Sequence, residues 1–240
     1  MTSLGQTLVR YVISSGSVNG TNLQAGNTYV LLYDGSGTIN VAGGVTMMSN
    51  AAGRIEFAIT NNNNSYFLNI TASDSNNHLR NFRLLRIADE FADLDANPFY
   101  SGFLDKIEPF ATLRFMDWGR TNSSPNTIWS DRTPVTALTY GTESGVPYEV
   151  MVKLANQTHQ NPWVCVPHLA DDNYVTQMST YFRDSLDPTL TVYLEYSNEV
   201  WNWIFAQSHY NADNAPSNLN YARAYAENAK RVFRDRKSVV

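Results

Sequence analysis

LTVYLEYSNEVWNW, residues 190–203, is the stretch that decides the fold of the second part of this chain. Its first half is mainly apolar, and it then changes abruptly to Ser197, Asn198 and Glu199. An apolar run that ends in polar side chains is typical of a strand in a parallel sheet, where ligands bind beyond the carboxyl ends of the strands. ATLRFMDW at 111–118 and PWVCVPH at 162–168 share this pattern.

Segments with the spacing of amphipathic helices alternate with these strands. Their residue ranges are 98–110, 146–160, 171–186 and 220–233. A further strand pattern, NFRLLRI at 81–87, precedes them. Alternating strands and helices predict a parallel sheet with helical crossovers. We therefore expect an α/β fold over residues 81–240, in the form of a partial (β/α)-barrel of about four βα units.

Residues 1–80 show a different pattern, made of short apolar or alternating runs separated by turn-rich pieces. The runs are TLVRYVIS, TYVLLYD, GTINVAG, GVTMMS, RIEFAIT and SYFLNITAS. Strands joined by short turns predict an antiparallel arrangement. We expect a first domain, residues 1–80, that is a β-sandwich or a jelly-roll-like region.

Composition excludes several classes of partner. The 240 residues carry a net charge of −5, and the scattered Lys and Arg form no basic stripe for nucleic acid. A single cysteine, Cys165, excludes an internal disulfide framework. No stretch approaches the roughly 20 apolar residues of a membrane span. Glycine-containing pieces such as DGSGT lie between β runs, so no nucleotide cofactor is implied. The oligomeric state is left open.

The predicted strand ends collect the side chains that carry chemistry. They are Asp117 and Trp118, His168, and Asn198 with Glu199. Because the carboxyl ends of parallel strands meet at one edge of a sheet, these residues are candidates for one site. Asp and Asn also cap helices that follow strands, so Asp117, Asp171 and Asp172 each have a purely structural alternative.

At LEYSNEVWNW the sequence resembles glycoside hydrolases of clan A, which are (β/α)8-barrels. RFMDW and NPWVCVPHLADD extend the resemblance, and the region is similar to bacterial cellulase-like and cellulose-binding barrel proteins. The resemblance implies that Glu199 is the general acid/base and that Asn198 holds a sugar hydroxyl. It also implies that Arg114 and His168 shape the site, although Arg114 could be a structural ion-pair partner and His168 a buried strand-end residue.

Aromatic residues near these strand ends are candidate sugar platforms, because aromatic faces stack on the C–H faces of pyranose rings. The candidates are Trp118, Trp163, Trp201 and Trp203, and some of them must belong to the core. The expected substrate is therefore a β-linked polysaccharide or oligosaccharide such as cellulose or a related glucan. No cofactor or metal is expected for this chemistry.

A second carboxylate is needed for glycosidic cleavage, and none is evident. Glu195 is four strand residues from Glu199, about 13 Å, which is too far for a catalytic pair. Asp117 is the remaining candidate within the chain. The ending DRKSVV, residues 235–240, reads like translated sequencing-adapter DNA. We expect these last six residues to be artefactual and the chain to be a fragment that lacks the strand-seven nucleophile of the clan.

Two other classes of function are compatible with the sequence. A metal hydrolase could use His168, Asp171 and Asp172 in HLADD, although their spacing is not a zinc signature. A carbohydrate-binding protein without catalysis would use the same aromatic residues. The start, MTSLGQTLVRYVISSG, shows no signal-peptide pattern. We nevertheless expect the full-length protein to be secreted or at the cell surface, because a polymeric substrate is found there.

Overall fold

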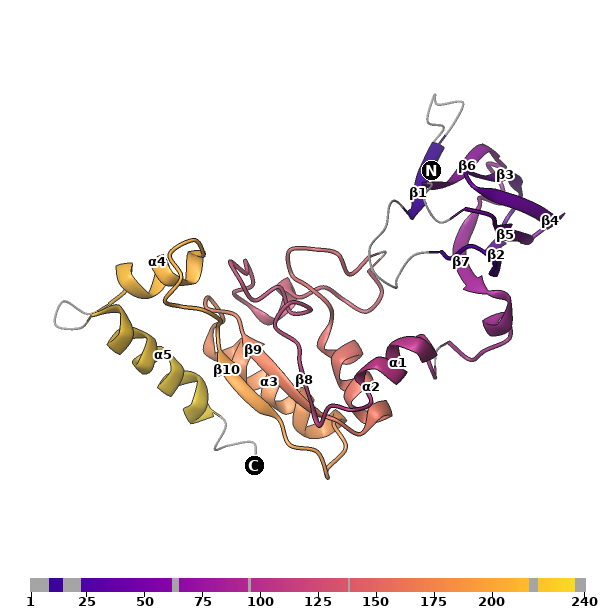
Figure 1. Cartoon of the computed structure of the whole chain (residues 1–240). Coiled ribbons are helices and arrows are strands. Elements are labelled where there is room, and N and C mark those ends of the chain that lie inside the picture. The colour runs from indigo at the N-terminus through magenta and orange to yellow at the C-terminus, as the bar shows by residue number, and fades with distance from the viewer. Residues whose placement is uncertain are drawn as a thin grey trace. The chain divides into compact units, whose positions relative to one another are not determined.

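The computed structural model describes residues 9–14, 23–61, 65–94, 96–137, 139–215 and 220–235. The chain divides into two compact units, residues 1–98 and 99–240 (Figure 1). Residues 236–240, on which most of the proposed artefactual ending falls, lie outside the described residues. Nowhere in the described ranges is a helix both long enough and apolar enough to cross a membrane.

The first unit is built from antiparallel sheets, as the sequence predicts. One sheet has the strand order β1-β6-β3 and the other has the order β4-β5-β2-β7. The strands are β1 (Val9–Ser14), β2 (Thr28–Asp34), β3 (Gly37–Ala42), β4 (Val45–Ala51), β5 (Arg54–Ile59), β6 (Tyr66–Ser73) and β7 (Arg80–Arg86). Strand β7 is followed by a 3-10 helix, η1 (Ile87–Asp89).

The alternation of buried and partly exposed residues along a strand explains how this unit forms its core. Along β5 every second residue is buried, namely Ile55, Phe57 and Ile59. Successive side chains of a strand point to opposite faces, so this pattern gives the strand one apolar face. Buried side chains from both sheets, among them Val41 of β3 and Leu68 of β6, join the same hydrophobic cluster. The two sheets therefore bury a common core.

The strand NFRLLRI is present, but its predicted place is wrong. As β7 it pairs antiparallel with β2, with Leu84 opposite Leu31, and it does not open the parallel sheet. An apolar pattern predicts that a segment is a strand but does not identify its partner strand. The contact boundary between the units consequently falls after Pro98.

The second unit contains a parallel sheet with the order β10-β9-β8. Its strands are β8 (Thr112–Arg114), β9 (Asn161–Val166) and β10 (Tyr193–Tyr196), and its helices are α1 (Ser101–Ile107), α2 (Tyr148–Thr158), α3 (Asp172–Ser185), α4 (Ala206–Asp213) and α5 (Tyr221–Asp235), with a 3-10 helix η2 (Trp129–Asp131). The prediction of a parallel α/β region is confirmed. The described residues form a three-stranded sheet, and no closed barrel is found among them.

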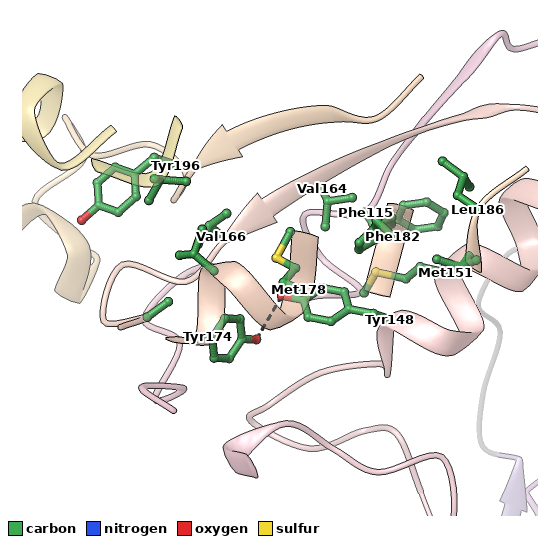
Figure 2. Close-up of a cluster of buried hydrophobic side chains, with 14 of the residues drawn as sticks. Phe115, Tyr148, Met151, Val164, Val166, Tyr174, Met178, Phe182, Leu186 and Tyr196 are labelled. Carbon is green, nitrogen blue, oxygen red and sulfur yellow. Dashed lines mark hydrogen bonds between the residues drawn. The ribbon is translucent and has the colours of Figure 1, made fainter. Parts of the chain in front are cut away.

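The core of the second unit lies between this sheet and its helices. Figure 2 shows Val164 and Val166 of β9 among Met151, Met178 and Phe182, and all five are buried. Each fully buried side chain of this size contributes roughly 1.5–3 kcal/mol through the apolar surface it removes from water. The hydroxyl groups of Tyr148 in α2 and Tyr174 in α3 form a hydrogen bond of 3.0 Å within this core, so neither hydroxyl is buried without a partner. This hydrogen bond joins the two helices.

Candidate functional site

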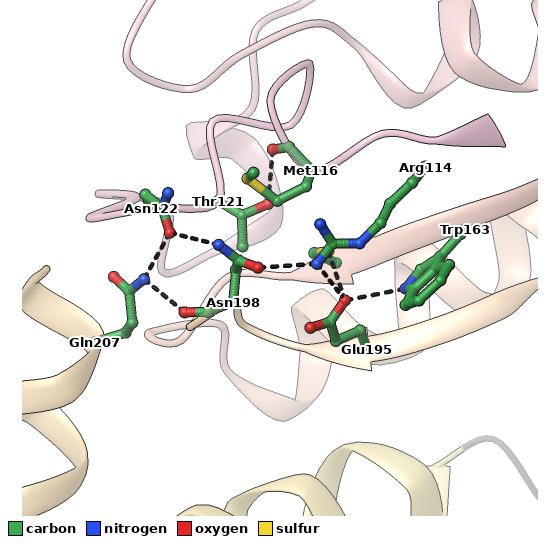
Figure 3. Close-up of polar contacts among 9 residues, drawn as sticks. Arg114, Met116, Thr121, Asn122, Trp163, Glu195, Asn198 and Gln207 are labelled. Atoms are coloured by element: carbon green, nitrogen blue, oxygen red, sulfur yellow. Dashed lines mark hydrogen bonds and ion pairs between the residues drawn. The ribbon is translucent and has the colours of Figure 1, made fainter. Parts of the chain in front are cut away.

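The face of the parallel sheet opposite the core carries polar side chains. Register places Arg114 of β8 beside Trp163 of β9, and Glu195 of β10 beside Cys165 of β9. Because alternate residues of a strand point to opposite faces, these four side chains share one face, while Val164 and Val166 point to the core. Figure 3 shows Arg114, Trp163 and Glu195 gathered on this face.

Glu195 is the centre of this group. Its Oε2 accepts hydrogen bonds from Arg114 Nη2 at 2.7 Å and from Trp163 Nε1 at 3.0 Å. The thiol of Cys165 donates to the same oxygen at 3.4 Å. The Arg114 guanidinium also lies over the Trp163 ring, 4.9 Å from its centroid. The carboxylate is thus held by donors from two neighbouring strands.

These contacts change the acidity of their members. Burial opposes the charge of Arg114, but its hydrogen bond to Glu195 and the nearby negative charges outweigh burial and raise the pKa of Arg114. Burial first, and the Glu195 charge second, raise the pKa of the Cys165 thiol to about 12. Cys165 is therefore protonated and unreactive at neutral pH.

Asn198 connects this group to the carboxyl end of β10. Its side chain is only 4% exposed, and its Oδ1 accepts from Arg114 Nη2 at 2.8 Å. Its Nδ2 donates to Asn122 Oδ1 at 2.9 Å (Figure 3). Arg114 and Asn198, both predicted site residues, are thus in direct contact.

Glu199 lies in a tight turn immediately after β10. Ser197 and Glu199 have φ values of 58° and 41°, in the left-handed region that residues with a Cβ rarely occupy. Such a conformation costs on the order of 1–3 kcal/mol per residue and is concentrated at functional sites. The backbone N–H of Ser197 donates to Val166 O at 2.8 Å, which ties the turn to β9.

The Glu199 side chain is half-buried and has a fixed partner. Its Oε2 accepts from Asn202 Nδ2 at 3.0 Å, and its backbone oxygen accepts from Asn202 N at 2.8 Å. Asn202 therefore holds both the turn and the carboxylate. The hydrogen bond from the Asn202 side chain goes to Oε2 and does not use the other carboxylate oxygen, Oε1.

Aromatic side chains follow Glu199 directly and are open to solvent. Trp201 is 65% exposed and Trp203 is 51% exposed. The Trp203 ring meets His209 and Tyr221 edge to face, at centroid distances of 5.3 and 5.9 Å. Two large exposed aromatic residues next to a carboxylate are suited to binding a ring with an apolar face.

The predicted residues of β8 are placed differently. Asp117 is exposed in the turn that follows the strand. Trp118 is partly buried in the core cluster, stacked on Phe103 with centroids 6.3 Å apart and tilted against Phe115. The Trp118 ring is therefore occupied by core contacts.

His168 is placed at the end of β9, as predicted, but it is only 2% exposed. Its ring meets the edge of Tyr210 at a centroid distance of 5.4 Å. Burial lowers the pKa of His168 to about 4, so the imidazole is neutral at pH 7. Its Nδ1 has no hydrogen-bond partner within the described part of the chain.

The residues of the HLADD alternative do not come together as metal ligands. Asp171 caps α3, its Oδ1 accepting from Tyr174 N at 2.6 Å, and Asp172 forms an ion pair with Arg231. Among the described residues, no group of three His, Cys, Asp or Glu side chains is arranged to hold a metal ion. The helix-capping interpretation holds for Asp171.

Sequence reasoning missed two residues that hold the site together, Asn122 and Gln207. Asn122 lies in the loop after β8, and Gln207 is fully buried in α4, a helix that the sequence did not predict. The buried residues of α4 are all polar, namely Gln207, Ser208 and Asn211. A search for an apolar stripe therefore could not find this helix.

A separate cavity of about 360 Å³ lies away from these residues. It is lined by α3 and by residues 186–194, at the amino end of β10. Its lining is mainly apolar and includes Met178, Phe182 and Leu194. It is therefore not part of the group at the carboxyl ends of the strands.

Comparison of the chain with protein-family models, curated proteins and solved structures gave no significant match.

Proposed function

We propose that this chain is part of a clan A-like glycoside hydrolase, with residues 99–240 forming part of a (β/α)-barrel and Glu199 acting as general acid/base. The proposed substrate is a β-linked polysaccharide such as cellulose or a related glucan. Such a polymer lies outside the cell, so the proposed full-length protein is exported or displayed at the cell surface.

One observation carries this proposal. Glu199 follows a strand of a parallel sheet in a left-handed turn, is held by Asn202, and is followed directly by the exposed rings of Trp201 and Trp203. A general acid must reach a glycosidic oxygen, and an adjacent aromatic platform would hold the sugar that carries it. The half-buried carboxylate and the open indoles supply these two elements within five residues of sequence.

The neighbouring residues support the same chemistry. Arg114 and Asn198 are fixed by a mutual hydrogen bond, which would present a rigid polar surface to sugar hydroxyls. Asn198 has a second N–H beyond the one given to Asn122, and this is the group that would meet a hydroxyl. Trp163, which is partly exposed on the same face as Arg114, would be a further contact.

Glycosidic cleavage also needs a second carboxylate. Glu195 already binds Arg114 and Trp163, so it acts as a structural anion on the sheet face. Asp117 is exposed in the turn after β8, which β9 separates from β10, and it is the remaining candidate among the described strand ends. A retaining mechanism would need it about 5 Å from Glu199, and an inverting one about 6.5–9.5 Å.

The test compares wild type, Glu199→Gln and a control, Glu143→Gln, which removes an exposed carboxylate in the loop before α2. Hydrolysis of β-glucans, mannans and xylans is followed together with binding of the same sugars. We expect Glu199→Gln to lower kcat by at least about 100-fold with little change in binding, and the control to retain full activity. Equal activity of all three proteins would refute the catalytic role.

A non-catalytic carbohydrate-binding protein is the second candidate. The exposed indoles of Trp201 and Trp203, in the absence of a clear carboxylate pair among the described strand ends, favour it. It predicts that all three proteins bind glycan equally well and hydrolyse none. Trp201→Ala would then weaken binding, because stacking on the ring is lost.

A further inference from the structure

Four amide and guanidinium side chains form a continuous chain beneath the turn that carries Glu199. Gln207 Nε2 donates to Asn122 Oδ1 at 2.8 Å and to the backbone oxygen of Asn198 at 2.7 Å. Asn122 Oδ1 also accepts from Asn198 Nδ2, and Asn198 Oδ1 accepts from Arg114, as Figure 3 shows. At its other end, Gln207 Oε1 accepts from the backbone N–H of Ser123 at 2.9 Å.

Two backbone groups fix the direction of every hydrogen bond in this chain. The N–H of Ser123 requires an acceptor and the carbonyl of Asn198 requires a donor, so the amide of Gln207 has a single satisfactory orientation. The atom of Asn122 that faces Gln207 must then be its oxygen. The atom of Asn198 that faces this oxygen must in turn be its nitrogen.

The Asn198 oxygen is thereby directed at Arg114, which is a donor only. Reversing any one amide would place two donors or two acceptors together in a buried site, at a cost of about 1–3 kcal/mol. Gln207 is itself held within α4, where Asn211 Nδ2 donates to its backbone oxygen at 2.8 Å. The donor and the acceptor of each hydrogen bond are therefore fixed along the whole chain, from Gln207 in α4 to Arg114 in the sheet.

We infer that Gln207 and Asn122 are positioning residues that set the orientation of Asn198 and hold the left-handed turn at Glu199. They touch no substrate in this proposal. Gln207 anchors the backbone oxygen between Asn198 and Glu199, and Asn122 anchors the Asn198 side chain. The inference rests on the proposed function only in naming Glu199 as the group whose position matters.

Two substitutions with the same change of charge should differ in effect, one being damaging and the other close to neutral. Asn122 takes part through its oxygen alone, so Asn122→Asp keeps both acceptor contacts. Gln207 takes part through its nitrogen as well, so Gln207→Glu loses at least one of two donated hydrogen bonds, whether the new carboxyl is charged or protonated. Both variants add one carboxyl group, but only Gln207→Glu removes a donor that is in use. A difference between them therefore reports the direction of hydrogen bonding and not the added acid.

Both variants are compared with wild type for kcat, KM and the alkaline limb of the pH profile on the most rapidly hydrolysed glucan. Displacement of the turn in Gln207→Glu should lower kcat by about 100-fold with KM within about threefold, while Asn122→Asp stays within about threefold in both. The alkaline limb should move in Gln207→Glu, because a general acid acts only while protonated and the surroundings of Glu199 have changed. Equal losses in the two variants, or none, would overturn the inference.

Melting temperatures give a readout that does not depend on catalysis. We expect Gln207→Glu to melt roughly 5–10 °C below wild type and Asn122→Asp to melt within about 2 °C of it. If wild type neither hydrolyses nor binds any of these glycans, the proposed function has failed, and the melting contrast alone decides the hydrogen-bond directions. Equal melting temperatures for the two variants would then overturn them.

Discussion

Acidification should destabilise the second unit through His168. This histidine is 2% exposed, and burial lowers its pKa to about 4, whereas an unfolded chain gives histidine its ordinary value of 6.5. Between these two values the unfolded chain binds a proton that the folded chain does not. Stability therefore increases with pH across this window and falls as the pH is lowered through it. Above about pH 7 the imidazole is neutral in both states, and the penalty is absent.

The size of this penalty follows from the two pKa values. A folded value of about 4 against an ordinary value of 6.5 corresponds to roughly 3 kcal/mol once both states are protonated. At pH 5, about 2 kcal/mol of this is already lost. For a chain of this size such a loss lowers the melting temperature by roughly 4–8 °C. The effect is large enough to measure beside the titration of other groups.

Tryptophan fluorescence isolates this effect, because all five tryptophans of the chain lie in the second unit. Unfolding is followed from pH 8 to pH 4 for wild type, His168→Gln and His159→Asn, the last replacing a histidine whose side chain is 66% exposed. His168→Gln should lose roughly 2 kcal/mol of the pH dependence between pH 7 and pH 5, whatever its absolute stability. An unchanged pH dependence in His168→Gln would refute the argument, as would an equal change in the control.

Two further outcomes test the packing of each unit. Cys165, buried and with its pKa raised to about 12, should react with iodoacetamide at pH 8 at least about 100-fold more slowly in the native protein than in urea, as mass spectrometry can measure. Native labelling at the unfolded rate would contradict the burial of this thiol. Phe57→Ala should cost the first unit about 3–5 kcal/mol and leave the tryptophan transition unchanged, whereas Met151→Ala should lower that transition. A shift of the tryptophan transition in Phe57→Ala would show that the units do not unfold independently.

Local pattern was sufficient to find the strands and most of the helices. Residues 28–34 were predicted as a strand and form β2 with the same bounds, because Val30, Leu31 and Tyr33 are apolar and buried. Pairing could not be predicted in the same way. Strand β7 was assigned to the parallel sheet, yet it pairs with β2, since pairing depends on contacts distant in sequence. Helix α4 was missed because its buried side chains are polar.

The candidate site was predictable only where residues follow a strand directly. Asn198 and Glu199 were found because they follow β10, whereas Arg114, which ends β8, was identified only through the resemblance to clan A. Asn122 and Gln207 belong to a loop and to a polar helix, so their contact with Asn198 depends on tertiary structure alone. Glu195 was excluded as a catalytic partner by strand geometry. Its role as the acceptor for three side chains could not be predicted, because it depends on the register of β8, β9 and β10.

The two interpretations of Arg114, ion-pair partner and site residue, are compatible in this structure. Both of its hydrogen bonds, to Glu195 and to Asn198, use Nη2. A guanidinium has five N–H groups, and a single Nη supplies two of them. The Nη1 and Nε groups are therefore not consumed by these two contacts, and the side chain is 35% exposed. An arginine whose position is fixed by one nitrogen can offer the others to a ligand without losing further side-chain entropy. Under the proposed function, the ion pair with Glu195 would thus hold Arg114 in position to bind a sugar.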